Sequence, residues 1–370
     1  MAIDASDHDS SDPWEAVGRR IVEYIKGPTL VFVNSRFAAE RLGEIVERLG
    51  LNGIYVHHSS VSRELRREAE RRLKEGSISA VVCTRTLELG IDVGSVKRVI
   101  QIRPTGSVSS LLQRVGRSGH NVGESSEGVL IALDGLEVLE AVATAVLAVK
   151  GDVEPSTVIE KPLDVLARQM VAMTMQYGAV DPERMYSIIK RAYPFRTLTP
   201  DEFRVVLNYL LSTELLTRSR DGKLKLGPSF HKLWRFDAKD KKWWAKNFAE
   251  FFSMIGERDS FAVKHENGTI GDVDALYVYK YLRIGDKIRL GGTVWRVIDI
   301  DESLFKVLVV PAEEGDGDIP LWRGEGARRS GHLAHKFLEI LKVVIDDLGR
   351  LNEILPSNVT IAERAYQHLK

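Results

Sequence analysis

The chain has 370 residues, too many for one ordinary hydrophobic core, so we expect roughly two or three domains. Lysine and arginine together number 52, as do aspartate and glutamate, and this balance excludes a protein-wide attraction for polyanions. The single cysteine, the acidic N-terminus and the lack of an apolar run of roughly twenty residues predict a cytoplasmic protein without a membrane segment, and no residues have metal-ligand spacing.

Apolar runs alternate with amphipathic stretches over residues 28–150, after a lead-in at 1–27 that we expect to be disordered or helical. Short β-branched runs predict strands, and a period near 3.6 between them predicts helices. We expect strands at 29–33, 53–57, 80–84, 98–102 and 128–133, and helices at 36–49 and 63–75. Because strands alternate with helices, this part predicts an α/β domain whose parallel sheet is covered on both faces.

Polar side chains follow three of these strands, at the point where each strand is expected to end. They are Asn34, Ser35 and Arg36 after the first, His57 and His58 after the second, and Thr84 and Arg85 after the third. Ligands of open α/β sheets bind beyond the carboxyl ends of the strands. These residues are therefore candidates for a binding site, and for the two histidines ordinary capping of a strand end is the alternative.

Residues 111–120, LLQRVGRSGH, carry two arginines among glycines. Gly116 and Gly119 allow the backbone to come close to a ligand, and the planar, permanently charged guanidinium group suits a phosphate. Arg114 and Arg117 are thus candidate phosphate ligands. The alternative is a polar turn beside a helix with both arginines in solvent.

Four stretches of this part resemble, in order and spacing, motifs IV, IVa, V and VI of superfamily 2 helicases, the ATP-driven translocases of nucleic acid. They are residues 29–36 (TLVFVNSR), 57–67 (HHSSVSRELRR), 83–93 (CTRTLELGIDV) and 111–120. The final histidine of GRSGH resembles the spelling in the large helicase-related (Lhr) family. This resemblance implies that residues 28–150 form the second of the two RecA-like domains of a helicase motor, the helicase C-terminal domain.

The resemblance also implies roles for individual residues. Arg117 would be the arginine finger that reaches ATP on the first motor domain, with Arg114 beside it on a phosphate or the cleft wall. The implied ATP-binding residues are Gly90, Asp92, Gln113, Arg114, Arg117 and His120, and the implied nucleic-acid contacts are Asn34, Ser35, Arg36, His58, Thr84 and Arg85. Many superfamily 2 helicases have a third arginine where His120 stands, and histidine is a weaker phosphate clamp near neutral pH.

The phosphate-binding loop of an ATPase, GxxxxGK[ST], does not occur in the chain. Gly222-Lys223 is followed by leucine, and the acidic strings that end at Asp301-Glu302 and at Asp347 have the periods of a strand and a helix. We therefore expect ATP with Mg²⁺ to bind mainly to a first motor domain, supplied in cis or in trans. The isolated chain is expected to hydrolyse no ATP.

Residues 151–235 predict a winged-helix domain. We expect a linker at 151–162 and helices at 163–177, 182–192 and 200–211. Thr199 and Glu202 form a capping box at the start of the last helix, and a hairpin with a two-residue Asp221-Gly222 turn follows it. The hairpin carries Arg218, Arg220, Lys223 and Lys225. Such wings contact the phosphate backbone more often than the bases, and a plain solvated surface is the alternative.

Residues 236–330 change to a period of two and resemble the β-rich domain that follows the winged helix in Lhr helicases. We expect a small antiparallel sheet or barrel with strands at 260–265, 285–290, 293–299 and 305–311. Trp322, beside Arg323 on a loop, is a candidate for stacking on an unpaired base; the alternative is that it plugs the end of the barrel. An amphipathic helix is expected at 331–351, within a C-terminal segment at 331–370.

These patterns predict an α/β RecA-like parallel-sheet domain, followed by an α-helical winged-helix domain and a small antiparallel β-rich domain. The implied function is that of the C-terminal part of an ATP-dependent DNA helicase or translocase, with single-stranded or forked DNA, or an RNA–DNA hybrid, as partner. The alternative is a non-catalytic module of helicase ancestry that binds single strands or junctions. ATPase activity on mixing with a Walker-type domain would separate the two.

Overall fold

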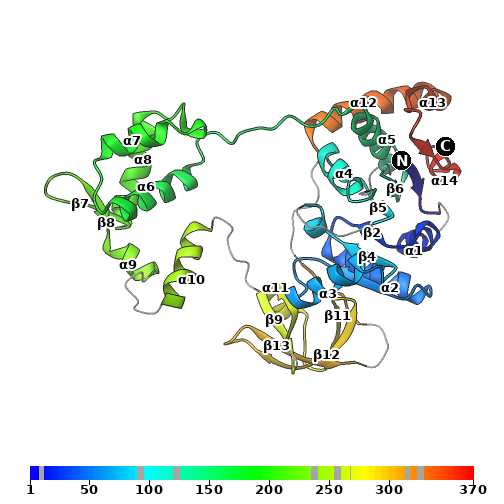
Figure 1. The fold of residues 1–370 in the computed structure, drawn as a ribbon, viewed down its shortest axis with the longest axis horizontal. Coiled ribbons are helices and arrows are strands. Elements are labelled where there is room, and N and C mark those ends of the chain that lie inside the picture. Colours follow the sequence, from blue (N-terminus) through cyan, green and yellow to red (C-terminus); the bar gives the residue numbers. More distant parts are fainter. Residues whose placement is uncertain are drawn as a thin grey trace. The chain divides into compact units, whose positions relative to one another are not determined.

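The computed structural model of the chain describes residues 1–7, 12–89, 96–119, 126–234, 241–253, 260–266, 268–312, 317–322 and 329–370, with only the backbone of 241–246. The chain folds as two compact units (Figure 1). One unit consists of Met1–Glu154 together with Arg258–Lys370, and the other consists of Pro155–Glu257. The first unit therefore joins the two ends of the chain.

A seven-stranded parallel sheet forms the centre of the first unit, in the order β14-β1-β6-β5-β2-β4-β3. The strands are β1 (Ala2–Ala5), β2 (Thr29–Phe32), β3 (Ile54–His57), β4 (Ala80–Cys83), β5 (Arg98–Ile102), β6 (Gly128–Ala132) and β14 (Thr360–Ile361). The prediction of a parallel α/β sheet is confirmed. The sequence did not predict β1 and β14: β1 (AIDA) has only one β-branched residue, and β14 has only two residues.

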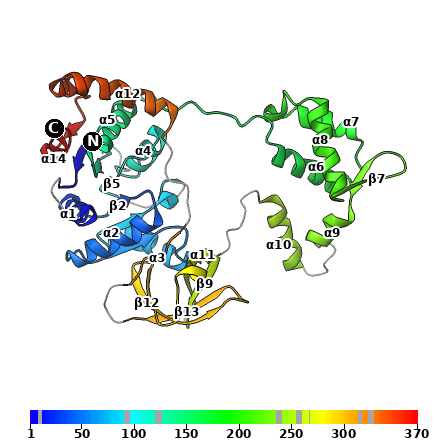
Figure 2. The same cartoon turned by 180° about the vertical axis from the view of Figure 1, so that it is seen from behind.

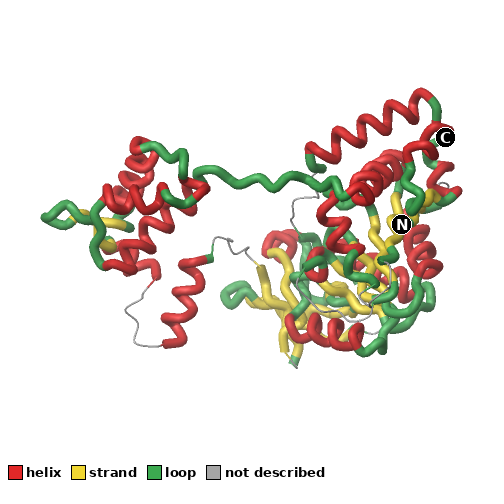
Figure 3. The backbone as a smooth tube through the Cα atoms, turned by 45° about the horizontal axis from the view of Figure 1, so that its top comes forward, coloured by secondary structure: helices red, strands yellow, loops and turns green. Residues whose placement is uncertain are grey.

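Helices cover both faces of this sheet, as the strands in yellow and the helices in red show in Figure 3. They are α1 (Pro13–Tyr24), α2 (Arg36–Arg48), α3 (Arg63–Lys74), α4 (Val108–Val115) and α5 (Gly135–Lys150), and α12 (Gly331–Asp346) lies outside α5. Successive residues of β2 point to opposite faces: Val31 packs with residues of α1 and α2, whereas Phe32 packs with Leu73 of α3. Burial on both faces of the sheet explains why β2 carries Leu30, Val31 and Phe32 beside a buried Thr29.

The C-terminal segment returns to the N-terminal strand (Figure 2). The helix α12 packs on α5, and the chain then passes through η3 (Leu348–Arg350), α13 (Leu351–Ile354), β14 and α14 (Glu363–Gln367). Arg364 Nη2 lies 2.6 Å from Oδ2 of the buried Asp4, which also accepts a hydrogen bond from the Tyr24 hydroxyl at 2.8 Å. Burial, together with this bond to Asp4, raises the pKa of Tyr24 to about 12. The helix predicted at 331–351 ends earlier than expected, at Asp346.

A five-stranded sheet completes the first unit, in the order β10-β9-β13-β12-β11. Its elements are β9 (Ser260–His265), β10 (Gly268–Asp274), α11 (Ala275–Lys280), β11 (Lys287–Leu290), β12 (Thr293–Asp301) and β13 (Lys306–Pro311). All neighbours are antiparallel except β9 and β13, which pair in parallel, so the sheet is mixed and not purely antiparallel as predicted. The sequence did not predict β10, where glycines and aspartates interrupt the alternation.

The second unit is a winged helix. It contains α6 (Leu163–Tyr177), α7 (Pro182–Lys190), η2 (Tyr193–Phe195), α8 (Pro200–Ser212), β7 (Leu216–Arg218), β8 (Leu224–Leu226), α9 (Pro228–Trp234) and α10 (Lys241–Phe252). The capping box of Thr199 and Glu202 is present as predicted. The turn prediction was wrong, because Ser219 N–H donates to Lys223 O at 2.9 Å and closes a longer loop that contains Arg220.

Candidate functional site

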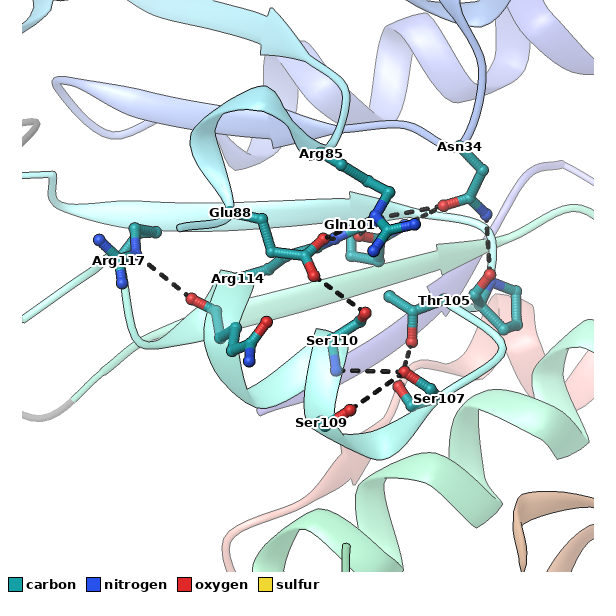
Figure 4. Close-up of polar contacts among 12 residues, drawn as sticks. Asn34, Arg85, Glu88, Gln101, Thr105, Ser107, Ser109, Ser110, Arg114 and Arg117 are labelled. Carbon is teal, nitrogen blue, oxygen red and sulfur yellow. Dashed lines mark hydrogen bonds and ion pairs between the residues drawn. The ribbon is translucent and has the colours of Figure 1, made fainter. Parts of the chain in front are cut away.

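Polar side chains from several elements meet at the carboxyl edge of the parallel sheet (Figure 4). Asn34 follows β2, and the 3-10 helix η1 (Arg85–Leu87) follows β4 and leads to Glu88. Gln101 lies on β5, and Arg114 lies near the end of α4. The motifs recognised in the sequence are therefore neighbours in space.

Arg114 is the centre of this group and is only 2% exposed. Its Nε donates to Glu88 Oε2 at 2.9 Å, and its Nη1 donates to Gln101 Oε1 at 2.7 Å and to Asn34 Oδ1 at 3.2 Å. The guanidinium carbon also lies 5.3 Å from the centroid of the Phe32 ring. A buried ion pair persists when surrounding groups bond its polar atoms, as they do here. Arg114 is therefore held inside the domain; of the two positions that the motif implies for it, a phosphate or the cleft wall, its bonds within the domain favour the wall.

Gln101 and Glu88 belong to this group although sequence reasoning missed both. The Gln101 Nε2 donates to the carbonyl oxygens of Ile102 at 2.8 Å and Arg103 at 2.7 Å, and thus holds the chain where Arg103 has a left-handed φ of 61°. Glu88 also accepts from the Ser110 hydroxyl at 3.0 Å. The one available signal was a polar residue in the apolar strand RVIQI, since a buried amide needs partners.

Arg117 lies apart from this cluster (Figure 4) and is half-buried. Its Nε donates to the carbonyl oxygen of Gln113, one turn earlier, at 3.4 Å. The Gln113 side chain is exposed. The other three residues of the expected ATP-binding set, Gly90, Asp92 and His120, lie outside the described residues. Two arginines three positions apart thus have different surroundings: Arg114 is buried in the domain, and Arg117 is near the surface.

The expected nucleic-acid contacts at this edge have different exposures. Ser35 is exposed and caps α2 through a bond from Ala38 N–H to its Oγ at 3.1 Å. Thr84 is half-buried, and the Arg85 side chain is 80% exposed, with its Nε 4.0 Å from Glu88 Oε2. Asn34 is half-buried and donates through Nδ2 to Pro104 O at 2.8 Å. Ser35 and Arg85 therefore lie at the surface beside the Arg114 cluster.

Both candidate histidines are bonded inside the protein. His57 Nδ1 lies 2.7 Å from Thr86 Oγ1, and its Nε2 lies 2.9 Å from Glu70 Oε1. Burial lowers the pKa of His57, and the bond to Glu70 opposes this shift. His58 is fully buried, with its Nε2 3.0 Å from Oε1 of Glu40. Neither ring is open to a ligand in this structure.

The fully buried Glu40 on α2 joins the parallel sheet domain to the β-rich domain. Its Oε1 accepts from Gly291 N–H at 2.6 Å, and its Oε2 accepts from Gly292 N–H at 2.9 Å. These glycines form the turn between β11 and β12, with φ values of 67° and 79°, a conformation that suits glycine. The two domains also bond through Ser60 Oγ, which donates to Asp272 Oδ2 at 3.0 Å. We call this contact, centred on Glu40, His58, Ser60, Asp272 and Gly291–Gly292, the seam.

Trp322 and Arg36 lie at the seam. The Trp322 ring packs against the core of the β-rich domain and lies 5.4 Å, edge-on, from the ring of His58. Its Nε1 donates to Asp272 O at 3.3 Å. The guanidinium carbon of Arg36 lies 5.8 Å from the Trp322 ring centroid, and its Nη1 donates to Ser60 Oγ at 2.5 Å. A residue of motif IV and a residue of the β-rich domain are thus in direct contact.

The wing of the second unit carries exposed positive charge. Its exposed cations are Arg218 on β7, Arg220 and Lys223 in the loop, and Lys225 on β8. Asp221 lies among them; bonds from Ser219 Oγ at 2.6 Å and from Lys223 Nζ, whose distance is 3.0 Å, lower the pKa of its carboxyl to about 2. One carboxylate thus neutralises part of this surface.

No group of three or more His, Cys, Asp and Glu side chains in the described part of the chain is arranged to hold a metal ion. Of the helices that the structure describes, none combines the length and apolar character needed to cross a bilayer.

Two protein families match this chain. Residues 15–121 match the helicase conserved C-terminal domain, and residues 147–319 match the winged helix domain of the large helicase-related protein. The second match includes the β-rich strands from β9 to β13. The chain belongs to the Lhr family. Its fold and the family suggested by the four motifs are both confirmed.

Relatives of this Lhr chain are longer proteins. It is 32% identical to the ATP-dependent helicase Lhr-Core of Methanocaldococcus jannaschii, over 92% of the chain and 40% of that protein. It is 34% identical to the Lhr helicase and probable uracil glycosylase of Mycolicibacterium smegmatis, over 89% of the chain and 24% of that protein. The chain therefore spans less than half the length of these relatives.

A solved structure of an Lhr helicase resembles the whole chain. The Mycobacterium smegmatis helicase Lhr bound to ssDNA and AMP-PNP has a TM-score of 0.67 and 27% identity, covering 100% of this chain and 44% of that one. The likeness extends over both units of this Lhr chain.

Proposed function

We propose that this chain is the second half of an ATP-dependent DNA translocase or helicase of Lhr type, and that it needs a first RecA-like motor domain, in cis or in trans, to hydrolyse ATP. The single observation that carries the proposal is the contrast on α4. Arg114 is fixed by buried partners, and Arg117, three residues later, is half-buried just beyond the end of α4, next to Ser118, which bridges to Val96 before β5. This arrangement suits an arginine presented to a nucleotide on a facing domain.

In the proposed reaction, ATP with Mg²⁺ is bound mainly by the first motor domain, because the chain contains no phosphate-binding loop. Arg117 acts as the arginine finger and stabilises negative charge that develops on the transferring phosphoryl group. Gln113 is exposed one turn before Arg117 and is proposed to face the same nucleotide, and Gly90, Asp92 and His120 keep the roles that the motifs imply. Nucleotide use by the relatives supports this assignment, since the M. smegmatis Lhr was solved with AMP-PNP.

We assign Arg114 a positioning role. Its bonds to Glu88 and Gln101 fix the last turn of α4, and the position of Arg117 follows from that turn. A guanidinium that is already surrounded by a carboxylate and two amide oxygens gains little from an additional phosphate, and moving it would leave Glu88 buried without its partner.

Single-stranded or forked DNA, or an RNA–DNA hybrid, is the proposed partner. The exposed Ser35 and Arg85, with Thr84 beside them, are placed to contact phosphates, and the wing cations Arg218, Arg220, Lys223 and Lys225 add a second basic surface. Asn34, Arg36 and His58 are proposed to support this surface from beneath, since each is bonded within the domain. Trp322 lies next to Arg36 and is the candidate for contact with a base.

The test combines the chain with a first motor domain of an Lhr helicase and measures ATP turnover with single-stranded DNA. We expect no turnover from the chain alone, DNA-stimulated turnover from the mixture, and a loss of about a thousandfold or more in kcat for Arg117→Ala. Arg48→Ala, which alters an exposed arginine at the end of α2, is the matched control and should leave kcat unchanged. Turnover by the repurified chain alone, or an unaltered kcat in Arg117→Ala, would contradict the proposal.

A non-catalytic binding module is the second candidate, and the exposed cations of the wing favour it. It predicts salt-sensitive binding of single strands by the chain, with no turnover in any mixture that contains an intact first motor domain.

A further inference from the structure

The helix that carries Arg114 and leads to Arg117 is short, and its N-terminus is capped by a residue distant in the sequence. At eight residues, α4 is below the length at which a helix holds by its own hydrogen bonds. Ser107 Oγ accepts from Ser110 N–H at 3.2 Å, as an ordinary cap does. The two preceding amides donate to a carboxylate far along the chain: Val108 N–H to Glu154 Oε1 at 2.6 Å, and Ser109 N–H to Glu154 Oε2 at 3.0 Å.

Glu154 also binds the start of a second helix. The Ser330 hydroxyl donates to Glu154 Oε1 at 3.0 Å, and Ser330 is the N-cap of α12. The backbone N–H of Ser330 donates to the carbonyl oxygen of Gly106 at 2.9 Å, and Gly106 lies just before α4 in the chain. Burial raises the pKa of Glu154, but the donated bonds from Val108, Ser109 and Ser330 outweigh burial and leave the pKa below its ordinary value. The carboxylate is therefore ionised at neutral pH and complements the positive end of the α4 dipole.

The position of Glu154 in the chain gives this cap a further consequence. It is the last residue of the first unit, and Pro155 begins the unit that contains the winged helix. The helix α5 ends at Lys150, and from there to α6 the chain has no helix or strand; residues 155–160 are exposed. The linker to the winged helix is thus attached, at its first end, to the N-terminus of the arginine-bearing helix.

We propose that Glu154 is the positioning residue through which the winged-helix unit acts on Arg117. The inference rests on the proposed function of Arg117. When the winged helix binds nucleic acid, tension in the linker changes the hydrogen bonds that the Glu154 carboxylate accepts from the amides of Val108 and Ser109. Because α4 is only about 12 Å long and its first turn depends on this cap, a change in the cap loosens the helix that carries Arg114 and leads to Arg117. ATP turnover is thereby coupled to the state of the winged helix.

The first experiment compares Glu154→Gln with Glu160→Gln in the chain combined with a first motor domain. An amide presents only one acceptor oxygen, so Glu154→Gln leaves Val108 N–H or Ser109 N–H without its partner. Glu160 lies in the same linker, pairs with Arg196 and does not touch α4, so it is the matched control. We expect Glu154→Gln to lower the DNA-stimulated kcat about tenfold or more, with the KM for ATP unchanged and Glu160→Gln like the wild type. An unchanged kcat in Glu154→Gln would overturn the proposal.

The second experiment separates transmission from simple capping. Flexible Gly-Ser residues inserted after Pro155 leave Glu154 and α4 intact but slacken the linker. We expect the insertion to reduce the stimulation of ATP turnover by DNA and to leave turnover without DNA unchanged. In the Glu154→Gln variant the insertion should lower kcat no further, because both changes interrupt the same connection. If Glu154 only caps α4, the insertion has no effect, and that result would overturn the proposal.

Hydrogen exchange of the chain alone distinguishes failure of this inference from failure of the proposed function. Amides of α4 should exchange about fivefold faster in Glu154→Gln, the size expected for a lost helix cap. Saturating single-stranded oligonucleotide should alter exchange in α4 of the wild type and not of the insertion variant. A mixture without ATPase activity would reject the proposed function, whereas equal responses of α4 in the two proteins would reject the role of Glu154 whatever the ATPase result.

Discussion

Two junctions between the parallel sheet domain and other parts of the chain are built in opposite ways. At the seam, a fully buried carboxylate, Glu40, accepts bonds from two backbone amides and lies 3.0 Å from a buried imidazole. At the other junction a linker of exposed residues leads from Glu154 to the winged helix. Removing a charge from water is costly unless donors surround it, so the seam persists only as a complete set of contacts.

The difference between the buried seam and the exposed linker indicates which parts of the molecule move as one body. The β-rich domain is attached to the parallel sheet by buried bonds and by the contact of Arg36 with Trp322, so we expect it to follow the motor domain. The linker has few buried apolar contacts, so it opens at a lower free-energy cost than the seam does. Four predictions test this contrast, from the largest expected effect to the smallest.

Glu40→Ala should be the most damaging of these changes. It leaves the amides of Gly291 and Gly292 and the ring of His58 without their acceptor, and breaking a buried charged contact in this way costs about 3–5 kcal/mol. Urea unfolding measures the loss. Glu47→Ala, on the same helix, removes an exposed partner 3.7 Å from Arg289 and should cost less than about 1 kcal/mol. Equal stability of the two variants would mean that the seam does not depend on Glu40.

Trp322→Ala should lower the free energy of unfolding by about 2 kcal/mol, because the ring packs against the core of the β-rich domain and its Nε1 donates to Asp272 O. The loss is smaller than for a fully buried tryptophan, since the Trp322 ring is only partly buried. A thermal melt and a titration with a single-stranded oligonucleotide are run on the same variant, with Trp322→Phe as the control that retains an aromatic ring. An unchanged melting temperature with binding weakened tenfold or more would instead assign Trp322 to base stacking alone.

Reversing two charges on the wing, in Arg218→Glu with Arg220→Glu, should weaken single-strand binding about tenfold at low salt and spare the fold, because both side chains are exposed. The loss should be similar for all sequences and should shrink as salt rises, since phosphate contacts release counterions. Arg191→Glu, an exposed arginine at the end of α7, is the control. Binding isotherms at several salt concentrations measure the effect, and unaltered affinity would remove the wing from the binding surface.

The pH dependence of stability should be the smallest effect. The pKa of His57 is lowered by burial, so the unfolded chain takes up a proton that the folded ring resists. The unfolding free energy should therefore be constant above the ordinary histidine pKa of 6.5 and fall below it. For one proton the slope is at most about 1.4 kcal/mol per pH unit. Urea unfolding at pH 7.5 and 5.5 measures it, and His57→Gln should show a shallower fall; equal falls would assign the effect to other groups.

The sequence by itself determined the local structure and the family. The apolar run of β2, the period of α2 and the capping box of Thr199 and Glu202 are all interactions between residues close in the chain, and each was predicted. Motifs IV to VI likewise consist of contiguous residues, so they are recognisable without knowing how the chain folds back. For the same reason the candidate role of Arg117 was available before the structure.

Only the tertiary structure decided which polar residues are buried and with what. Glu40 is one charge among many on an amphipathic helix until Gly291 and Gly292, about 250 residues later, bring two amides to it. Arg114 and Arg117 look alike in the sequence, and their surroundings differ because Glu88 and Gln101 arrive from other elements. Strand β1 lies between β6 and β14, and both partners come from segments far along the chain. Burial of a charge depends on donors supplied by distant segments, and a local pattern of residues carries no information about where those segments return.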